Sequence, residues 1–345
     1  MTDRVVEGTV LRGEGFDPVE GRVVVEDGRI AAVEEAPTDS TDVLLPAFVN
    51  AHTHVGDSVA KEAGEGLDLD ALVAPPDGLK HRILDETDDD ALVDAMVRTL
   101  RYMRATGTGA FVDFRENGVG GVRLLRRALD EAAAGLDATV LARGSEAAVD
   151  AADGVGASGA RDADYEPLRR AAREAGKPFG IHAGERDPAD VNPALDLDPD
   201  HLVHMVHLDD VHLDRLAASP VPVVVCPRSN LVTGVGLPDL AALRTRTAVA
   251  LGTDNAFLDA PSMFREMEFA AKLFDASARE VLWMATGAGA QVANLDCGVI
   301  EAGREARILV LDGGSDNLAG AQSLVRAVVR RAGVGDVRET ILPGD

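Results

Sequence analysis

Between residues 44 and 296, apolar runs typical of strands alternate with Ala-, Leu-, Arg- and Glu-rich stretches typical of helices. This alternation predicts a parallel sheet with helices outside it, because parallel neighbours need a long crossover connection. Eight such runs over about 250 residues match the size of a closed (β/α)8 barrel of the TIM type, so we predict an α/β fold of this architecture. Strands are expected at 44–52, 109–114, 138–143, 154–159, 178–182, 202–206, 221–226 and 248–252, and the clearest helices at 88–105, 122–134, 165–175 and 261–273.

A second, smaller unit is predicted from the two ends of the chain. Residues 5–11 and 22–33 resemble short strands, and Asp27-Gly28 is a strong hairpin signal. A piece this small cannot form its own core, so it needs partner strands from elsewhere. Further strand-like runs occur at 306–312, 324–329 and 337–342. We therefore expect a small β-sandwich from residues 1–44 and 299–345, beside a barrel from residues 45–298.

Two histidines one residue apart end the first apolar run of the predicted barrel. Side chains alternate along a strand, so His52 and His54 point to the same side and can bind one metal ion together. Later apolar runs also end in polar residues, namely His182 with Glu185, His204, and Asp254. Because the active site of a parallel barrel gathers at the carboxyl ends of its strands, we expect these side chains to meet at one rim.

The chemistry of these residues suggests a metal-dependent hydrolase. Imidazoles of His52, His54 and His182 and the carboxylate of Asp254 suit one divalent ion, Zn²⁺ or alternatively Fe²⁺, with one position left for water. Such an ion lowers the pKa of bound water towards ~7. Glu185 follows Gly184, which permits a turn, and we assign it to proton transfer. We expect His204 to donate a hydrogen bond to the developing oxygen and Asp254 to relay a second proton.

Some nearby residues have two interpretations. His201 and His207 differ in parity from His204, so on a regular strand they would not point the same way, and His204 is the preferred catalytic residue. His207 is then expected to play a supporting role. The segment 226–230 follows the predicted seventh strand, and it is equally compatible with lining the rim or lining the site.

The rim predicted for substrate is cationic, which is unexpected in so acidic a chain. An arginine fork matches a carboxylate or a ring carbonyl, so these cations suggest a ring-amino heterocycle with carbonyl or acidic substituents. The alternative is that the arginines only pair with neighbours such as Asp113 and Glu116. The candidate substrate residues are Lys80, His81, Arg82, Arg115, Arg143 and Arg228.

Composition limits the partners. The chain has 59 acidic and 34 basic side chains, a net charge of −25, and 46% hydrophobic residues. Such a surface repels nucleic acid backbones and anionic membranes, so we expect a small-molecule substrate and neither of those partners. The acidic, lysine-poor balance suggests adaptation to molar salt. Two cysteines without metal-ligand spacing, and the lack of a long apolar run, favour a cytoplasmic protein. A homo-oligomer is compatible with the sequence, which leaves the oligomeric state open.

The ordered motifs resemble the amidohydrolase superfamily, in the branch that contains cytosine deaminase, S-adenosylhomocysteine deaminase and the triazine chlorohydrolases. They cover nearly the whole chain: His52-Thr53-His54 after 45–50, His182-x-x-Glu185, His204-x-x-His207, Pro227-x-Ser229-Asn230, Gly252-Thr253-Asp254 and the segment 298–306. Two of them also resemble adenosine deaminase. The resemblance implies one metal ion on His52, His54, His182 and Asp254, with Glu185 and His204 handling protons.

The resemblance also disfavours a binuclear site. Binuclear members carry a bridging, carboxylated lysine at the end of barrel strand four, and no lysine occurs between Lys80 and Lys177. The rim loops and the tail after Leu342 are shorter than is usual for this branch, which affects the substrate pocket.

Three functions follow from these observations. The favoured function is hydrolytic deamination, in which water replaces an exocyclic amine on an aromatic ring and ammonia leaves. The alternative on the same scaffold is hydrolysis of an amide or cyclic amide, or of a halide as in a chlorohydrolase. A third possibility, from another class, is an inactive binding protein on a retained barrel, which the intact set of ligands and proton carriers argues against.

Overall fold

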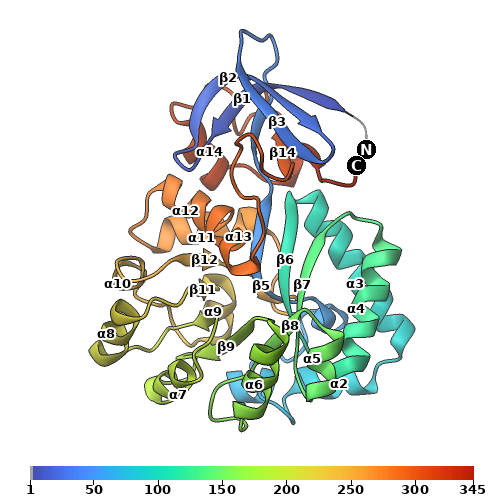
Figure 1. Cartoon of the computed structure of the whole chain (residues 1–345), viewed down its shortest axis with the longest axis vertical. Helices are drawn as coiled ribbons and strands as arrows, with labels where there is room; N and C mark the ends of the chain where they lie inside the picture. The colour runs from blue at the N-terminus through green and yellow to red at the C-terminus, as the bar shows by residue number, and fades with distance from the viewer. Residues whose placement is uncertain (1–2) are drawn as a thin grey trace.

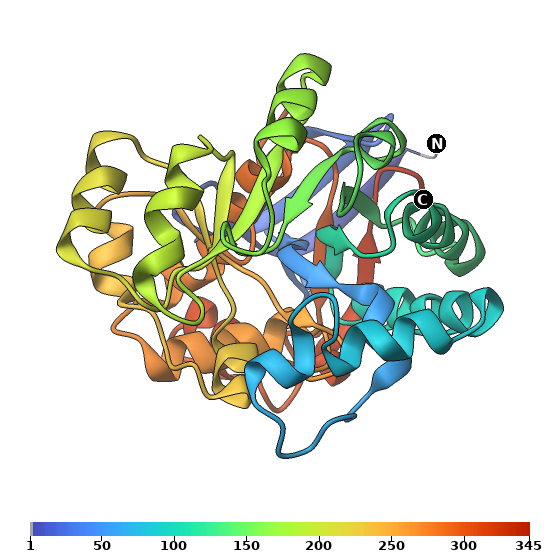
Figure 2. The ribbon, with the colours of Figure 1, turned by 90° about the horizontal axis from the view of Figure 1, so that it is seen from below.

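The computed structural model describes residues 3–345. A nine-stranded, all-parallel sheet occupies the centre of the larger part of the molecule, and helices surround it (Figures 1 and 2). Its strands, in sheet order, are β12 (Val249–Leu251), β11 (Val223–Val225), β10 (His201–His204), β9 (Phe179–Ala183), β8 (Gly154–Ala157), β7 (Asp137–Ala142), β6 (Thr108–Arg115), β5 (Phe48–His54) and β13 (Asp254–Asn255). All eight predicted strand regions are therefore strands, and the α/β class is confirmed.

The two edge strands of this order are near neighbours in the chain. β12 and β13 are separated only by Gly252 and Thr253; β12 pairs with β11, and β13 pairs with β5. The amide of Thr253 donates to the carbonyl of His52 at 3.0 Å, and Asn50 Nδ2 donates to Thr253 Oγ1 at 2.7 Å. One short segment of chain thus contacts both edges of the sheet.

Helices follow most of the parallel strands, and the four predicted helices are confirmed within a few residues. They are α3 (Asp89–Ala105), α4 (Gly118–Ala132), α6 (Glu166–Ala175) and α11 (Met263–Leu273). The others are η1 (Val55–Ala60), α1 (Leu69–Val73), α2 (Leu79–Glu86), α5 (Glu146–Ala151), η2 (Pro188–Asp190), α7 (Val191–Asp196), α8 (Asp210–Ala218), α9 (Pro227–Thr233), α10 (Leu240–Arg244), α12 (Ala278–Met284), α13 (Gly287–Ala293), α14 (Leu324–Arg330) and η3 (Val334–Asp336). No helix within residues 3–345 combines the length and the apolar character needed to cross a membrane.

Both termini contribute to a separate mixed sheet at the top of Figure 1, as the sequence predicted. Its six strands, in sheet order, are β15 (Val337–Ile341), β14 (Ile308–Leu311), β4 (Val43–Pro46), β1 (Arg4–Arg12), β2 (Asp17–Glu26) and β3 (Arg29–Glu35). β4 pairs with both β1 and β14, so hydrogen bonds join all six strands into one sheet. The sandwich prediction is therefore confirmed only as a separate β unit built from both ends.

The predicted strand at 324–329 is wrong, because these residues form helix α14. Val325, Val328 and Val329 are buried in the main hydrophobic core, and their spacing is that of one helix face. Ser323 caps this helix, since its side chain accepts a hydrogen bond from the amide of Arg326. The β-branched residues suggested a strand, but packing against α11 and α12 selects the helix.

Candidate metal centre

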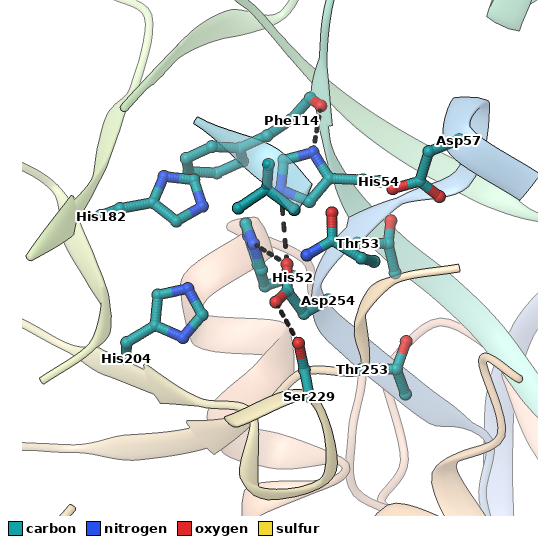
Figure 3. Close-up of polar contacts among 12 residues, drawn as sticks. His52, Thr53, His54, Asp57, Phe114, His182, His204, Ser229, Thr253 and Asp254 are labelled. Atoms are coloured by element: carbon teal, nitrogen blue, oxygen red, sulfur yellow. Dashed lines mark hydrogen bonds and ion pairs between the residues drawn. The ribbon is translucent and has the colours of Figure 1, made fainter. Parts of the chain in front are cut away.

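The four residues predicted as metal ligands converge at the carboxyl end of the parallel sheet (Figure 3). One ligand atom from each of His52, His54, His182 and Asp254 lies within 4.8 Å of the others, and all four side chains are buried. Nε2 of His52 is 3.2 Å and Nε2 of His54 is 3.4 Å from Oδ1 of Asp254. Residues separated by up to about two hundred positions in sequence are thereby brought to one point, because parallel strands all end at the same rim.

An irregularity in β5 helps to aim the two histidines. Val49 and Ala51 pack in a cluster with other inward-facing residues of the sheet, which would leave position 52 facing outwards on a regular strand. The pairing with β6 shifts, however, because Asn50 lies opposite Phe111 while Thr53 lies opposite Asp113. Three steps along β5 thus match two along β6. A bulge of this kind re-aims side chains and is common beside active sites.

Hydrogen bonds orient two of the imidazoles. Nδ1 of His54 lies 2.9 Å from the carbonyl oxygen of Phe114, and Nδ1 of His182 lies 2.8 Å from that of Ala157. A carbonyl only accepts, so Nδ1 carries the proton in both rings and Nε2 keeps its lone pair for a metal. Burial lowers the pKa of His52 and His182, and burial with the nearby Lys80 charge lowers the pKa of His54 to about 3. The rings are therefore neutral, as metal ligands must be.

Asp254 is held as a carboxylate. Burial by itself would raise its pKa, but the hydrogen bond with His52 and the neighbouring imidazoles together lower that pKa well below its ordinary value. Its second oxygen, Oδ2, accepts a hydrogen bond from Ser229 Oγ at 2.5 Å. Asp254 has φ of 58°, a left-handed conformation that costs energy in a residue other than glycine. Neighbours thus hold this carboxylate in a fixed orientation.

Glu185 and His204 lie beside the four predicted ligands. Oε2 of Glu185 is 3.7 Å from Nε2 of His204, and both side chains have an atom within 4.8 Å of Asp254. Gly184 has φ of 63°, and a Cβ there would lie 3.0 Å from the His207 carbonyl oxygen, so the turn does depend on glycine. Burial raises the pKa of Glu185. A carboxyl group with a raised pKa is suited to accepting and returning a proton.

The parity argument that separated His201 from His204 is wrong, although His204 does reach the site. His204 has φ of 74° and Met205 has φ of 51°, so the strand is not regular where it ends. His201 packs against Phe114, with ring centroids 5.7 Å apart, and His204 also faces the interior, 5.3 Å from the His182 ring. His207 is half-buried beyond the end of β10 and does not line the cavity over the metal centre.

Only part of the predicted cationic rim lines this cavity. Lys80 and Arg143 do so together with His54, His182 and Glu185, and His81 lines an adjoining cavity. Arg82 is exposed on α2 and lies outside both linings, so the structure does not bring it to the site. Among the residues that the sequence had not singled out, the lining includes Ser158, Asp162, Arg186, Asp190 and Asn255.

Arg115 and Arg228 are neutralised by carboxylates instead of facing a ligand. On β6, Ala110, Val112 and Phe114 face inwards, so Arg115 points outwards, where Nη2 contacts Glu116 Oε2 at 2.7 Å. Arg228 is buried between Asp259, at 2.5 Å, and Glu266, at 3.3 Å. The assignment of these two arginines to substrate is therefore corrected, and the alternative of local pairing applies to both.

Ser229 and Asn230 answer the question left open for the segment 226–230. Both are buried on α9, where Ser229 holds Asp254 and Asn230 Oδ1 lies 2.9 Å from Nδ1 of His204. They position the site and do not merely line the rim. The sequence carried a signal for them, since Pro227-x-Ser229-Asn230 was one of the family-like motifs, but residue types alone did not reveal which side chains they would hold.

Comparison with known proteins places the chain in a family. The model of the amidohydrolase family matches residues 43–344. A putative aminohydrolase of Methanothermobacter thermautotrophicus is 34% identical over 90% of this chain and 92% of its own length. A 5-methylthioadenosine/S-adenosylhomocysteine deaminase of Halobacterium salinarum is 30% identical over 100% of this chain and 92% of its own. The chain belongs to the amidohydrolase family.

Solved structures agree in fold. The crystal structure of an adenosine deaminase from Xanthomonas campestris with bound zinc superposes with a TM-score of 0.80, at 20% identity, over 99% of this chain and 92% of its own. At this identity the likeness concerns the fold. Within the family, the His52, His54, His182 and Asp254 cluster is a site suited to a divalent metal ion.

Proposed function

We propose that this protein is a metal-dependent hydrolytic deaminase that acts on an amino-substituted nitrogen heterocycle of the pyrimidine, purine or pterin type. The observation that carries the proposal is the position of Glu185 and His204 beside a buried cluster of three histidines and Asp254, most of which line one cavity. The names of the deaminase relative and of the solved adenosine deaminase support deamination over the other reactions of this scaffold.

We propose Zn²⁺ as the ion, with Fe²⁺ as the alternative. The donor set fits, because it offers three neutral imidazole nitrogens and one carboxylate oxygen, and two of the rings are fixed through Nδ1. The zinc bound to the adenosine deaminase structure supports this choice. A divalent ion on His52, His54, His182 and Asp254 would supply Lewis acidity, which lowers the pKa of water to about 7.

The proposed roles of the surrounding side chains follow from their contacts. Glu185 takes a proton from the attacking water and returns it to the heterocycle, for which its raised pKa is suited. His204 is oriented by Asn230, whose Oδ1 lies 2.9 Å from its Nδ1, and it donates a hydrogen bond to the oxygen that forms on the ring carbon. Asp254 accepts the second proton and passes it to the leaving amine, while Ser229 keeps its carboxylate in place.

We also propose that the parallel sheet closes into a (β/α)8 barrel, and that the chain divides into residues 1–44 with 299–345 and residues 45–298. Support for closure comes from β12 and β13, which form the two opposite ends of the strand order although only two residues separate them in the chain. β4 (Val43–Pro46) spans the proposed boundary. The link from β4 to β5 is a single residue, Ala47, so the two units are closely coupled.

The setting of the protein is likewise a proposal. The net charge of −25 and the presence of 30 arginines among 34 basic residues support adaptation to molar salt. A cytoplasmic location and a small-molecule substrate, without nucleic acid as a partner, are consistent with that charge. Elution volume in molar salt would give the oligomeric state, for which a homo-oligomer is one outcome.

Ammonia release tests the proposed reaction. The zinc-loaded protein, assayed at high salt on a panel of aminated pyrimidines, purines and pterins, should release ammonia from at least one of them. Glu185→Gln should keep its metal and lose turnover by ~10²-fold or more, because the proton carrier is gone. Glu166→Gln, on the exposed face of α6, is the matched control and should behave as the wild type. A fully active Glu185→Gln would remove Glu185 from the mechanism, and activity only on amides or chlorinated rings would favour the alternative.

A further inference from the structure

Arg143, whose side chain is 15% exposed, differs from the buried Arg115 and Arg228 because its charge is poorly matched. Its Nε is buried without a hydrogen-bond partner among residues 3–345, and its closest carboxylate contact there is Glu116 Oε1, at 3.8 Å. That carboxylate is already shared, since Arg115 lies 2.7 Å and Lys80 2.9 Å from it. A guanidinium that is largely buried and unpaired is costly, unless a ligand supplies the missing acceptor.

Arg186 also lines the cavity, and it is paired with Asp70 at 2.5 Å and Asp162 at 3.2 Å. Lys80, a further cation in the lining, is likewise better satisfied than Arg143. Its Nζ donates to Asn255 Oδ1 at 3.0 Å and contacts Glu116. Arg115 is directed away from the cavity, as described above. Arg143 is therefore the cation of this cluster whose donors are available to a bound molecule.

The position of Arg143 places these donors within reach of a substrate. It lines the cavity over the metal centre, and it also lines the adjoining cavity, which shares Pro75, Ser158 and Asp162 with the first. His54 and His182, two of the predicted ligands, line the first of these cavities together with Arg143. Alternation along β7 explains this direction, because Leu141 faces the interior and position 143 has the same parity.

Arg143 and the proton-handling pair belong to different sectors of the rim. Arg143 follows β7, whereas Glu185 follows β9 and His204 ends β10, with β8 lying between β7 and β9 in the sheet. A planar ring held over the metal centre would thus present one edge to Glu185 and His204 and another edge to Arg143.

We propose that Arg143 is a specificity residue, and that the substrate carries an oxygen acceptor, either a ring carbonyl or a carboxylate on the ring, on an edge other than the one that loses the amine. The inference rests on the proposed deaminase function only in assuming which edge of the ring loses its amine. The guanidinium fork donates two parallel hydrogen bonds to the two oxygens of a carboxylate, or donates to the single oxygen of a ring carbonyl, and either contact satisfies a cation that the protein itself leaves underpaired.

Matched substrate pairs test the proposal with the zinc-loaded full chain. Each pair differs in one acceptor: cytosine with 4-aminopyrimidine, guanine with 2-aminopurine, and an aminopyrimidine with and without a ring carboxylate. The wild type should prefer an acceptor-bearing member by ~10- to 100-fold in kcat/KM, as expected for a charged hydrogen bond. Arg143→Gln should abolish that preference through KM, and Arg143→Lys should restore part of it. The carbonyl and carboxylate pairs show which acceptor is recognised.

Arg265→Gln, an exposed substitution on α11, removes the same charge outside the linings of both cavities and should leave the preference unchanged. Metal content and thermal unfolding of each variant check that the site is intact. The proposal is overturned if the wild type shows no preference in any pair, or if Arg143→Gln retains it.

Equilibrium binding measurements distinguish a failure of this inference from a failure of the deaminase proposal. If no pair releases ammonia, equilibrium binding of the same compounds to zinc-loaded Glu185→Gln protein decides the matter. A preference for the acceptor-bearing member that Arg143→Gln removes would keep Arg143 as the specificity residue while the proposed reaction fails. Equal binding of both members in every pair would reject the role of Arg143 as well.

Discussion

The two β units of this protein differ in whether their ion pairs are exposed or buried. In the mixed sheet the ion pairs are at the surface, as in Arg22 with Glu34 across β2 and β3, whose side chains are 46% and 45% exposed. At the carboxyl end of the parallel sheet, Lys80 with Glu116 and Arg228 with Glu266 form pairs in which each side chain is at most 4% exposed. Buried pairs are costly to desolvate, and removing one member leaves an uncompensated charge. Mutations should therefore have little effect in the first unit and large effects in the second.

The largest effect is expected at the metal centre. His182→Ala should remove most of the metal and the turnover, because even losing a partner of a ligand costs ~10- to 100-fold in affinity, and here the ligand itself is lost. His207→Ala changes a histidine outside the cavity and should retain the metal. Elemental analysis with activity measures both variants, and unchanged metal stoichiometry in His182→Ala would show that the ligand set is wrong.

A matched pair of arginine substitutions tests the contrast in stability. Arg228→Met should lower the free energy of unfolding by ~3–5 kcal/mol, because Asp259 and Glu266 lose their buried cation. Arg22→Met, in the mixed sheet, should lower it by less than about 1 kcal/mol, since its pair is exposed. Denaturant unfolding at constant high salt measures both. Equal losses of unfolding free energy in the two variants would mean that the buried and the exposed ion pairs contribute equally to stability.

The pH dependence of stability should also differ between the units. Burial raises the pKa of Asp113 to about 6, against the attraction of Arg115. A folded pKa above the unfolded value favours the protonated form in the fold, so this contribution is complete below pH ~4 and is lost as pH rises through about 6. It amounts to at most about 3 kcal/mol. The Asp113→Asn variant should not lose this stability as the pH rises, because asparagine does not titrate.

The control for Asp113 is an exposed aspartate such as Asp39→Asn, which should follow the wild type between pH 4 and 6. Unfolding free energies of the three proteins, measured at several pH values in one salt concentration, give the comparison. Parallel curves for wild type and Asp113→Asn would show that Asp113 does not titrate in this range.

Much of the site could be predicted from the sequence, because it depends on the order of the strands along the chain and on the alternation of side chains along each strand. The runs that end in His52-x-His54, His182, His204 and Asp254 were recognisable as strands of one parallel sheet, and such strands end at one rim. Alternation along β6 and β7 could also have separated Arg143, which faces inwards, from Arg115, which faces outwards. For these two arginines the information was present in the sequence.

Other features depended on contacts that are remote in sequence. The bulge in β5 and the left-handed conformation of His204 interrupt the regular period, and local residue preferences do not reveal either one. Residues 324–329 have the β-branched content of a strand, yet the core beneath α14 selects a helix. The sequestration of Arg228 by Asp259 and Glu266 likewise follows from how α9 and α11 pack together.

The sequence by itself determined the class of fold, the order of the strands' polar ends and the chemistry those ends can support, because these follow from local periodicity and residue type. Only the tertiary structure decided which cations remain free to meet a ligand. That outcome depends on the balance of charges brought together from distant segments, and on the cost of burying any one of them without a partner.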